Sequence, residues 1–263
     1  MKRFSSLFAV LPTLFLFSSV AGAASTAVPQ VFHQPINILG VEHNNVTSEN
    51  WSGYAVESTS QFTEALGSWV QPTASCTGLG HTYGAFWVGL DGFTSTSVEQ
   101  LGTDSDCKSL NSPSYYAWYE FYPAASVTLS SSQYPVKPGD TLTASVTRSG
   151  TSYTLSLHSS VGWTFSTTRT GSDANSSAEW VAEAPDTCLL GLLCSNANLT
   201  NFGSVTFSGA EAAVGGSLEP VSSFTDNSGP HAIAMTTSSG TTRAQPSALS
   251  TNGEGFSDTW KHA

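Results

Sequence analysis

Positive charge is scarce in this chain of 263 residues. Eight lysines and arginines stand against 19 aspartates and glutamates, and the formal net charge is −11 at pH 7. Nucleic acids are bound through clusters of basic side chains, so the composition argues against a nucleic-acid partner. With only six histidines in addition, protonation of every carboxylate would leave a modest positive charge. Because self-repulsion in acid would then be mild, the composition favours a protein that works at low pH.

No apolar run is long enough to cross a membrane, which takes about 20 residues. The longest run lies near the start, where Lys2 and Arg3 precede the apolar stretch 7–17 and the small residues 21–23. This order is typical of a secretory signal peptide over residues 1–23. We therefore expect a secreted, extracellular protein that has no membrane partner after removal of the signal peptide and acts as a monomer.

Cysteine is limited to four residues, Cys76, Cys107, Cys188 and Cys194. An even number in an exported chain favours disulfides over free thiols. Cys188 and Cys194 flank a short leucine-rich loop and are expected to pair, which leaves Cys76 with Cys107. The chain lacks the C-x-x-C and H-x-x-x-H spacings of zinc sites, so no metal is expected, nor any other cofactor.

Several catalytic templates are also missing. The sequence has no G-x-S-x-G elbow, no H-E-x-x-H pair, no P-loop and no dinucleotide fingerprint. A histidine base would be protonated below about pH 6.5, which fits poorly with a chain adapted to acid.

Helical periodicity is absent over any three turns, and no internal repeat is evident. From residue 51 onward, short β-branched and aromatic runs are broken about every ten residues by turn-forming residues, which predicts an all-β antiparallel sandwich or barrel. We expect strands at 84–90, 115–122, 141–148, 153–158, 162–168, 177–183, 204–208 and 232–237. Residues 47–263 are expected to form one domain. Residues 24–46 carry almost no charge and are expected to be a pro-segment or an N-terminal arm.

The run 177–185 contains two carboxylates in a strand-like, otherwise apolar stretch. Alternation places Glu179, Val181 and Glu183 on one face of the strand. Glutamate is depleted in strands, so two in one run need a reason. The two carboxylates lie about 13 Å apart along the strand, which suggests different roles. The alternative, a solvated outer face of a sheet, stays open.

A second run, 115–123, is aromatic on both faces. Tyr116, Trp118, Glu120 and Tyr122 share one face. An unpaired buried Glu120 would cost several kcal/mol, so a groove that holds a carboxylate is favoured over a strand buried on both sides.

In the run 84–92, Trp87 and Asp91 fall on one face, and Asp91-Gly92 is a turn signal. The stretch beyond it is expected to be a loop that contains Gln100. A glutamine in a loop is ordinarily a surface residue, so Gln100 alone carries little functional signal.

Taken in order, five motifs resemble the glutamic peptidases, or eqolisins: 50–54 (NWSGY), 87–92 (WVGLDG), 100–102 (QLG), 118–123 (WYEFYP) and 178–183 (AEWVAE). The resemblance covers residues 47–260. It implies a sandwich of two curved antiparallel sheets, similar to legume-lectin (concanavalin) and glucanase folds, with a substrate groove on the concave face. It also implies an acid-active endopeptidase that pepstatin does not inhibit and that acts on proteins or peptides.

By motif, the family's catalytic dyad falls on Gln100 and Glu179. The positions that line the family's site are matched by Trp51, Trp87, Asp91, Asp104, Trp118, Glu120 and Tyr122. The loop between Asp91 and Gln100 is short and lacks the cysteine of fungal members, and residues 182–184 replace a bulkier, more acidic ending. These departures affect loop geometry and substrate preference.

The chemistry of the two residues is consistent with this resemblance. A carboxylate with a reference pKa of about 4.3 can act as general base toward water in mild acid. An amide is neutral at every pH, so Gln100 can donate an N–H to a developing oxyanion. Glu179 would then pass its proton to the leaving amine.

Two other functions remain possible at this stage. A glycoside hydrolase on the same sandwich would use Glu179 and Glu120, with carboxyl groups about 5 Å apart if retaining or roughly 6.5–9.5 Å if inverting. A non-catalytic carbohydrate-binding module would use Trp51, Trp87 and Trp118 as platforms for sugar rings.

Overall fold

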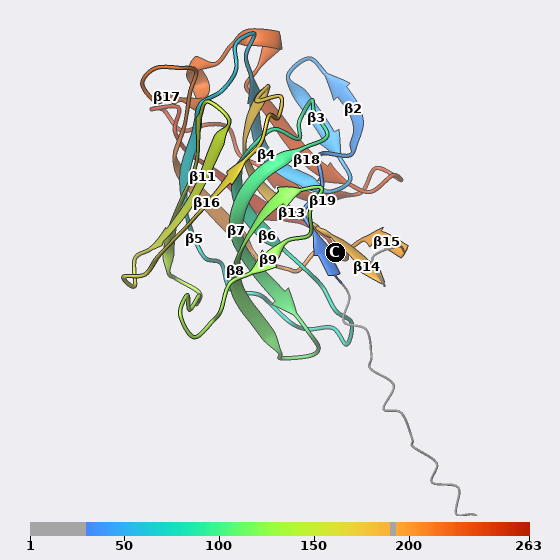
Figure 1. Ribbon diagram of the computed structural model, residues 1–263. Helices are drawn as coiled ribbons and strands as arrows, with labels where there is room; N and C mark the ends of the chain where they lie inside the picture. Colours follow the sequence, from blue (N-terminus) through green and yellow to red (C-terminus); the bar gives the residue numbers. More distant parts are fainter. Residues whose placement is uncertain (1–29, 190–192) are drawn as a thin grey trace, which may run out of the picture.

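The computed structural model describes residues 30–189 and 193–263; the expected signal peptide lies outside the described residues (Figure 1). Strands make up nearly all of its regular structure. Two short 3-10 turns, η1 (Val221–Ser223) and η2 (Asp226–Ser228), complete the described elements. No helix in this part of the chain is long and apolar enough to cross a membrane.

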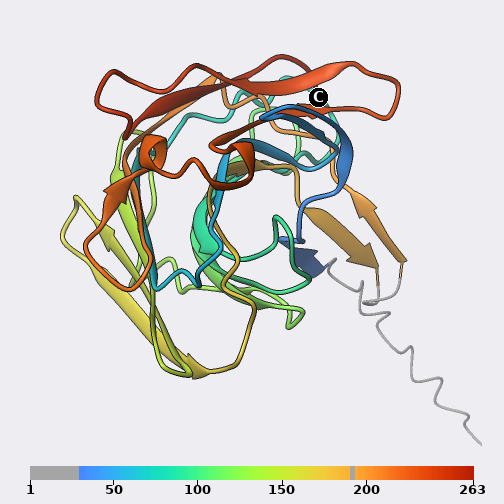
Figure 2. The same cartoon turned by 90° about the horizontal axis from the view of Figure 1, so that it is seen from above.

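Seventeen of the described strands form one continuous sheet that folds over into two layers, and Figure 2 shows the layers from above. The front layer has the order β9-β8-β7-β6-β13-β4-β18. Its strands are β4 (Trp51–Glu57), β6 (Ala85–Leu90), β7 (Val98–Cys107), β8 (Pro113–Tyr122), β9 (Val127–Thr128), β13 (Ser177–Glu183) and β18 (His231–Thr236). All these pairs are antiparallel, so the chain returns repeatedly across the same face.

The back layer has the order β12-β11-β10-β5-β16-β20, and β19 joins β20 to β18 of the front layer. Its strands are β5 (Glu64–Val70), β10 (Thr141–Ser149), β11 (Ser152–Ser159), β12 (Thr164–Thr170), β16 (Ser204–Ala213), β17 (Glu219–Pro220, paired with β16), β19 (Thr242–Pro246) and β20 (Phe256–Trp260). An all-β antiparallel sandwich is therefore confirmed.

The N-terminal part of the described chain joins both the main sheet and a small one. β3 (Asn45–Ser48) pairs parallel with β18, and β2 (Ile38–Glu42) pairs with β3. β1 (Gln30–Phe32), β14 (Asp186–Leu189) and β15 (Leu193–Asn196) form a separate three-stranded sheet. Residues 38–48 are thus built into the front layer.

Both expected disulfides are present: Cys76 is bonded to Cys107, and Cys188 to Cys194. The first ties the segment before β6 to the end of β7. The second joins the paired strands β14 and β15.

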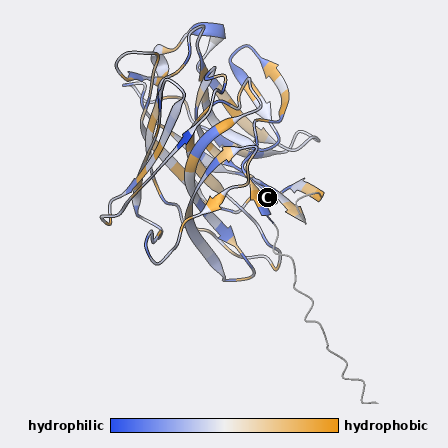
Figure 3. Ribbon diagram, in the orientation of Figure 1, coloured by the Kyte–Doolittle hydropathy of each residue, from blue (hydrophilic) through white to orange (hydrophobic). Residues whose placement is uncertain are grey.

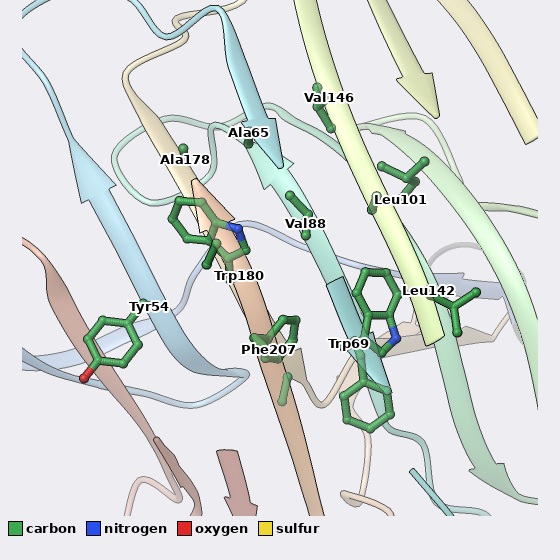
Figure 4. Close-up of a cluster of buried hydrophobic side chains, with 14 of the residues drawn as sticks. Tyr54, Ala65, Trp69, Val88, Leu101, Leu142, Val146, Ala178, Trp180 and Phe207 are labelled. Atoms are coloured by element: carbon green, nitrogen blue, oxygen red, sulfur yellow. The ribbon is translucent and has the colours of Figure 1, made fainter. Parts of the chain in front are cut away.

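Alternation along the strands produces the core between the layers, and Figure 3 shows hydrophobic and hydrophilic residues alternating along many of them. On β13, Ala178, Trp180 and Ala182 face the back layer, where they meet aromatic and aliphatic side chains of β5, β10 and β16 (Figure 4). Trp180 is fully buried, and its Nε1 donates to the carbonyl oxygen of Leu66 at 2.7 Å.

Gly67 of β5 lets the two layers approach at this point. A Cβ atom at residue 67 would lie 2.6 Å from Cδ1 of Trp180, closer than van der Waals contact allows. The indole therefore packs against bare backbone, and the close approach depends on both residues.

All eight expected strands are confirmed, with ends that differ by a few residues. The expected loop around Gln100 is wrong, because residues 98–107 form β7, a central strand of the front layer. Its sequence, VEQLGTDSDC, is polar and rich in residues disfavoured in strands. The strand is buried along its whole length, and part of its polar content is satisfied by hydrogen bonds, from Nε1 of Trp69 to Thr103 at 2.9 Å and from Nε2 of Gln71 to Ser105 at 2.8 Å.

Replacement of Trp180 by alanine should destabilise the fold by about 3–5 kcal/mol, because it leaves a cavity between the layers and removes the hydrogen bond to Leu66. Urea unfolding followed by circular dichroism measures this. Leu79→Ala is the control, since Leu79 is 86% exposed and its loss should change stability by less than about 0.5 kcal/mol. Equal effects of the two substitutions would contradict the packing described for the core.

Candidate active site

The two residues of the expected dyad lie in one row across the front layer. Glu179 of β13 is paired with Gly89 of β6, Gly89 with Gln100 of β7, and Gln100 with Glu120 of β8. Because residues opposite one another in a ladder have side chains on the same face, all three polar side chains point away from the back layer. We call this outer surface of the front layer the site face, and the row of Glu179, Gly89, Gln100 and Glu120 the dyad row.

Gly89 lies between Glu179 and Gln100 in this row, directly under the ring of Trp87. The two residues are two strand spacings apart, about 10 Å between Cα atoms. A Cβ atom at residue 89 would lie 2.9 Å from the Trp87 ring and 3.2 Å from Cβ of Gln100. Because Gly89 has no side chain, the Trp87 ring and the Gln100 side chain can pack over it.

A second row, of apolar residues, lies beside the first. Val181, Trp87, Gly102 and Trp118 are paired in that order across β13, β6, β7 and β8. A Cβ at Gly102 would clash with Trp87, at 2.6 Å from its Cβ. Small residues thus alternate with large ones across the strands, and the indole rings of Trp87 and Trp118 lie next to the dyad row.

Glu179 is completely buried, and neither of its carboxylate oxygens has a hydrogen-bond partner among the described residues. Burial raises the pKa of Glu179 well above its usual value, and the nearby carboxylates of Asp91 and Glu99 raise it further. Ser177 and the backbone N–H of Phe93 lie near enough to oppose part of the rise, although neither makes a hydrogen bond of normal geometry. The group is therefore set up to take and hold a proton.

Asp91 positions the turn that precedes β7 against the start of β13. Its carboxylate accepts hydrogen bonds from the backbone N–H groups of Asn175 at 2.6 Å and Ser176 at 2.9 Å. These residues directly precede the strand that carries Glu179. We therefore assign Asp91 to positioning rather than to contact with substrate.

Asp104 lies in a third row, between Ala85 and Tyr116. The Tyr116 hydroxyl is 2.8 Å from Oδ2 of Asp104 and 2.8 Å from Oδ2 of Asp106. One hydroxyl carries one proton, so the two contacts together require a proton on one of the carboxyls. Burial raises the pKa of Asp104 to about 7 and that of Asp106 well above its usual value, which supplies this proton in acid.

Glu183 lies in the same row as Asp104 and is held by a hydrogen bond from Trp87. Nε1 of Trp87 donates to Oε2 of Glu183 at 2.8 Å, and the Trp87 ring meets Trp51 edge to face, with centroids 4.9 Å apart. Burial raises the pKa of Glu183 well above its usual value, and Glu120 raises it further. Its distance along β13 from Glu179 leaves it outside the dyad row.

His33, from the N-terminal part of the chain, covers the other end of the dyad row. Its carbonyl oxygen accepts a hydrogen bond from Nε2 of Gln100 at 2.5 Å. Its backbone N–H donates to Oε2 of Glu120 at 2.9 Å, and its ring nitrogen Nδ1 lies 3.0 Å from the same oxygen. The imidazole stacks on Trp118, with centroids 3.4 Å apart and an interplanar angle of 3°.

The contact between His33 and Glu120 affects the pKa of both side chains. Burial raises the pKa of Glu120, while the hydrogen bond from His33 opposes the rise. Burial lowers the pKa of the His33 imidazole, and the hydrogen bond and charge of Glu120 oppose that fall. Each group therefore supports the charged form of the other inside a dry site.

The structure brings most of the expected site residues to the site face: Gln100, Glu179, Trp51, Trp87, Asp104, Trp118, Glu120 and Tyr122. Asp91 lies at its margin. Sequence reasoning missed two features. Gly89 is an ordinary residue until its neighbours in the sheet are known, and His33 lies 87 residues from Glu120, so no local pattern signals their contact.

Two known peptidases resemble this chain in sequence. Aspergillopepsin-2 of Aspergillus niger is 32% identical over 202 residues, which cover 66% of this chain and 67% of that protein. Scytalidopepsin B of Scytalidium lignicola is 32% identical over 146 residues, which cover 53% of each chain. The shared region includes much of the sandwich.

A solved structure shares the fold. The crystal structure of scytalido-glutamic peptidase with a transition state analog inhibitor superposes with a TM-score of 0.69 at 25% identity, and the match covers 81% of this chain and 98% of that one.

The fold, the site and these relatives define the class of the protein: it is a glutamic-type endopeptidase, a hydrolase that acts on proteins or peptides. The chain belongs to the Peptidase A4 family, whose model matches residues 49–253. The resemblance found in the five sequence motifs is thereby confirmed.

The buried carboxyls predict that the fold loses stability as pH rises. Burial raises the pKa of Glu99 to about 9, and those of Asp104 and Asp258 to about 7. The folded state therefore holds protons that the unfolded chain releases near its ordinary pKa values, so stability is fully present below about pH 4 and is lost as pH rises through 7 to 9. Thermal unfolding at pH 4, 7 and 8.5 should show a falling midpoint.

Glu99→Gln isolates one group, because an amide cannot ionise. This substitution should remove part of the pH-dependent loss of folding stability, on the order of 3 kcal/mol between pH 4.5 and 7. Glu42→Gln, at an exposed position, is the control. A midpoint that rises from pH 4 to 8.5 would show that the buried carboxyls are not held in their neutral form.

Proposed function

We propose that this protein is a secreted, acid-active endopeptidase in which Gln100 and Glu179 activate water for attack on a peptide carbonyl. One observation carries the proposal: the two side chains share a row in which only Gly89 separates them. An amide donor and a carboxylate can then reach the same carbonyl group from either side. A reacting carbon between a base and an oxyanion donor is what acyl transfer to water requires.

Gln100 has the role of oxyanion donor. Its Nε2 already donates to a backbone carbonyl oxygen, that of His33, in the covered site. A substrate carbonyl in the same place would receive this hydrogen bond, and the bond would strengthen as negative charge develops on the oxygen. Because an amide does not titrate, this contribution is the same at every acid pH.

Glu179 has the role of base and then acid. As base it takes a proton from water while the water oxygen attacks the carbonyl carbon, and it then gives that proton to the leaving nitrogen. In the covered site its raised pKa keeps it neutral in mild acid. Exposure of the groove to water would reduce the desolvation that raises this pKa, so Glu179 could ionise once the groove opens.

The remaining site residues bind substrate. Trp51, Trp87 and Trp118 provide apolar surface, and Glu120 offers an acceptor to a backbone N–H, as it does for His33. Tyr122 lies on the same face as Glu120; burial raises the pKa of its hydroxyl, and the charge of Glu120 raises it further. Asp104 holds the Trp118 indole by accepting from its Nε1 at 2.6 Å.

The structure gives little support to the two rival functions. A module that only binds sugars has no use for the amide and the carboxylate that share the row with Gly89. Glu179 and Glu120 are three strand spacings apart, about 14 Å between Cα atoms, which is wide for a glycosidase pair. Neither observation favours a function other than peptide hydrolysis.

We also propose an extracellular location for this protein. Two disulfides and the N-terminal signal sequence fit a protein exported from the cell. We propose that it acts as a monomer, without metal or other cofactor, and that pepstatin does not inhibit it.

Glu179→Gln should abolish hydrolysis of a denatured protein at about pH 4, because it keeps the side-chain volume but removes the base. Gln100→Ala should lower kcat by on the order of 100-fold, because it removes a donor that acts in the transition state. Both are measured on enzyme shown to be folded by circular dichroism.

Matched controls come from exposed positions. Glu219→Gln and Gln133→Ala make the same chemical changes away from the site face and should retain full activity. Near wild-type turnover by Gln100→Ala would mean that the amide is not the oxyanion donor, and the proposed mechanism would be wrong.

A further inference from the structure

The segment 30–37 crosses the site face: residues 30–32 form β1, and residues 33–37 continue without regular structure, with a bend at Pro35. Its first part, β1, pairs antiparallel with β14: Gln30 with Cys188, Val31 with Thr187 and Phe32 with Asp186. The carbonyl oxygen of Val31 also accepts from Oγ of Ser126 at 2.8 Å. An extended peptide that adds to a sheet edge by main-chain hydrogen bonds is a common way for proteins to bind peptides.

The segment continues past Gln100 on the other side of His33. The carbonyl oxygen of Gln34 accepts from Nε1 of Trp51 at 3.0 Å. That of Pro35 accepts from Nδ2 of Asn50 at 3.1 Å, and the N–H of Ile36 donates to the carbonyl oxygen of Gly92 at 3.1 Å. The chain is therefore held by hydrogen bonds on both sides of the carbonyl that Gln100 contacts.

This arrangement is that of a bound substrate. Among the described residues, the carbonyl oxygen that accepts from Nε2 of Gln100 belongs to His33, so the peptide bond presented to the proposed oxyanion donor is His33–Gln34. Glu120 accepts from the backbone N–H of the same residue. The side chain of His33 fills a place with its own chemistry: a stacking face on Trp118 and an acceptor on Glu120.

We propose that the enzyme cleaves its own chain between His33 and Gln34, and that the place occupied by His33 selects histidine on the acyl side of the cleaved bond in its substrates. The inference rests on the proposed function, because it uses the same dyad. A flat ring that can carry positive charge gains both from the indole face and from the carboxylate of Glu120. An aliphatic side chain gains from neither interaction.

The reaction balances with one water molecule. The water oxygen forms a bond to the carbonyl carbon of His33, and the bond from that carbon to the nitrogen of Gln34 breaks. One water proton reaches this nitrogen through Glu179, which leaves a carboxyl group on His33 and an amine on Gln34. No oxidant, reductant or other co-reactant is needed.

The cut separates two parts of the chain with different attachments. Residues 38–48 lie in β2 and β3 and stay in the front layer, where Val46 is 1% exposed. Of the residues before the cut, the described ones, 30–33, are held by the pairing of β1, by the hydrogen bond from Ser126 to Val31 and by the contacts of His33, and their departure frees Gln100, Glu120 and Trp118. The expected pro-segment of residues 24–46 would then end at residue 33, and residues 34–46 would remain as an arm.

The test uses the full chain, purified near neutral pH and transferred to about pH 4, with intact mass and peptide mapping over time. Mass measurement is needed because an N-terminal glutamine can cyclise and block sequencing. We expect one early product that begins at Gln34, formed at a rate independent of protein concentration, since the segment already lies in its own groove. Glu179→Gln should stay intact.

Hydrolysis of a denatured protein, assayed in parallel, separates the two proposals. Hydrolysis of that protein with no cut at residues 33–34, or with a first cut elsewhere, would overturn the inference and leave the proposed function standing. Failure of both reactions would contradict the proposed function, and the inference with it.

The histidine preference has its own test. His33→Ala should slow the self-cleavage at least tenfold, and His158→Ala, at an exposed position of β11, should not change it. The processed enzyme should also cleave the peptide QVFHQPIN at least tenfold faster, in kcat/KM, than the same peptide with alanine in place of histidine. Equal rates in both comparisons would overturn the preference, whatever the outcome at the full chain.

Discussion

The site depends on a position that has no side chain. Gly89 lies between Glu179 and Gln100 in the register of β13, β6 and β7, and a Cβ atom there would lie 2.9 Å from the Trp87 ring and 3.2 Å from Cβ of Gln100, so a larger residue would displace these side chains. The register matters equally, because a slip of one residue in either ladder would turn every site residue to the opposite face. Packing of Trp180 on the core side of β13 therefore also fixes Glu179 on the site side.

Burial of negative groups is the second constraint on this molecule. Glu179, Glu183, Glu120 and Asp104 are nearly inaccessible, and in each case burial is the largest cause of a raised pKa. Among the described residues, Glu179 and Glu183 have no basic partner within ion-pair distance, so protons rather than ion pairs neutralise these two groups. Low pH thus favours both the folded state and the acid chemistry proposed for the site. The scarcity of basic residues and the raised pKa values of the buried carboxyls both fit a protein that works at low pH.

Much of the fold could be predicted from the sequence because alternation is a local signal. The run 177–183 placed Glu179 and Glu183 on one face and Trp180 on the other, and the structure agrees. β7 could not be predicted in this way. Its side chains are polar on the site face, and its stability comes from neighbours on β6 and β8 that are distant in sequence.

The contact between His33 and Glu120 lay beyond sequence reasoning for the same physical reason. It joins parts of the chain 87 residues apart, and neither residue carries a local pattern that names the other. The motifs did locate Gln100 and Glu179, but only as members of a family pattern. Their placement in one row, over Gly89, is information that the ladder pairing alone provides.

The central claim is that Gln100 and Glu179 act together on one carbonyl group. A crystal structure of the processed enzyme with a peptide that carries a tetrahedral hydroxyl in place of the cleaved bond tests this most directly. The account predicts that the hydroxyl oxygen lies within about 3 Å of both Nε2 of Gln100 and a carboxylate oxygen of Glu179. A hydroxyl bound between Glu120 and Glu183, with Gln100 turned away, would contradict it.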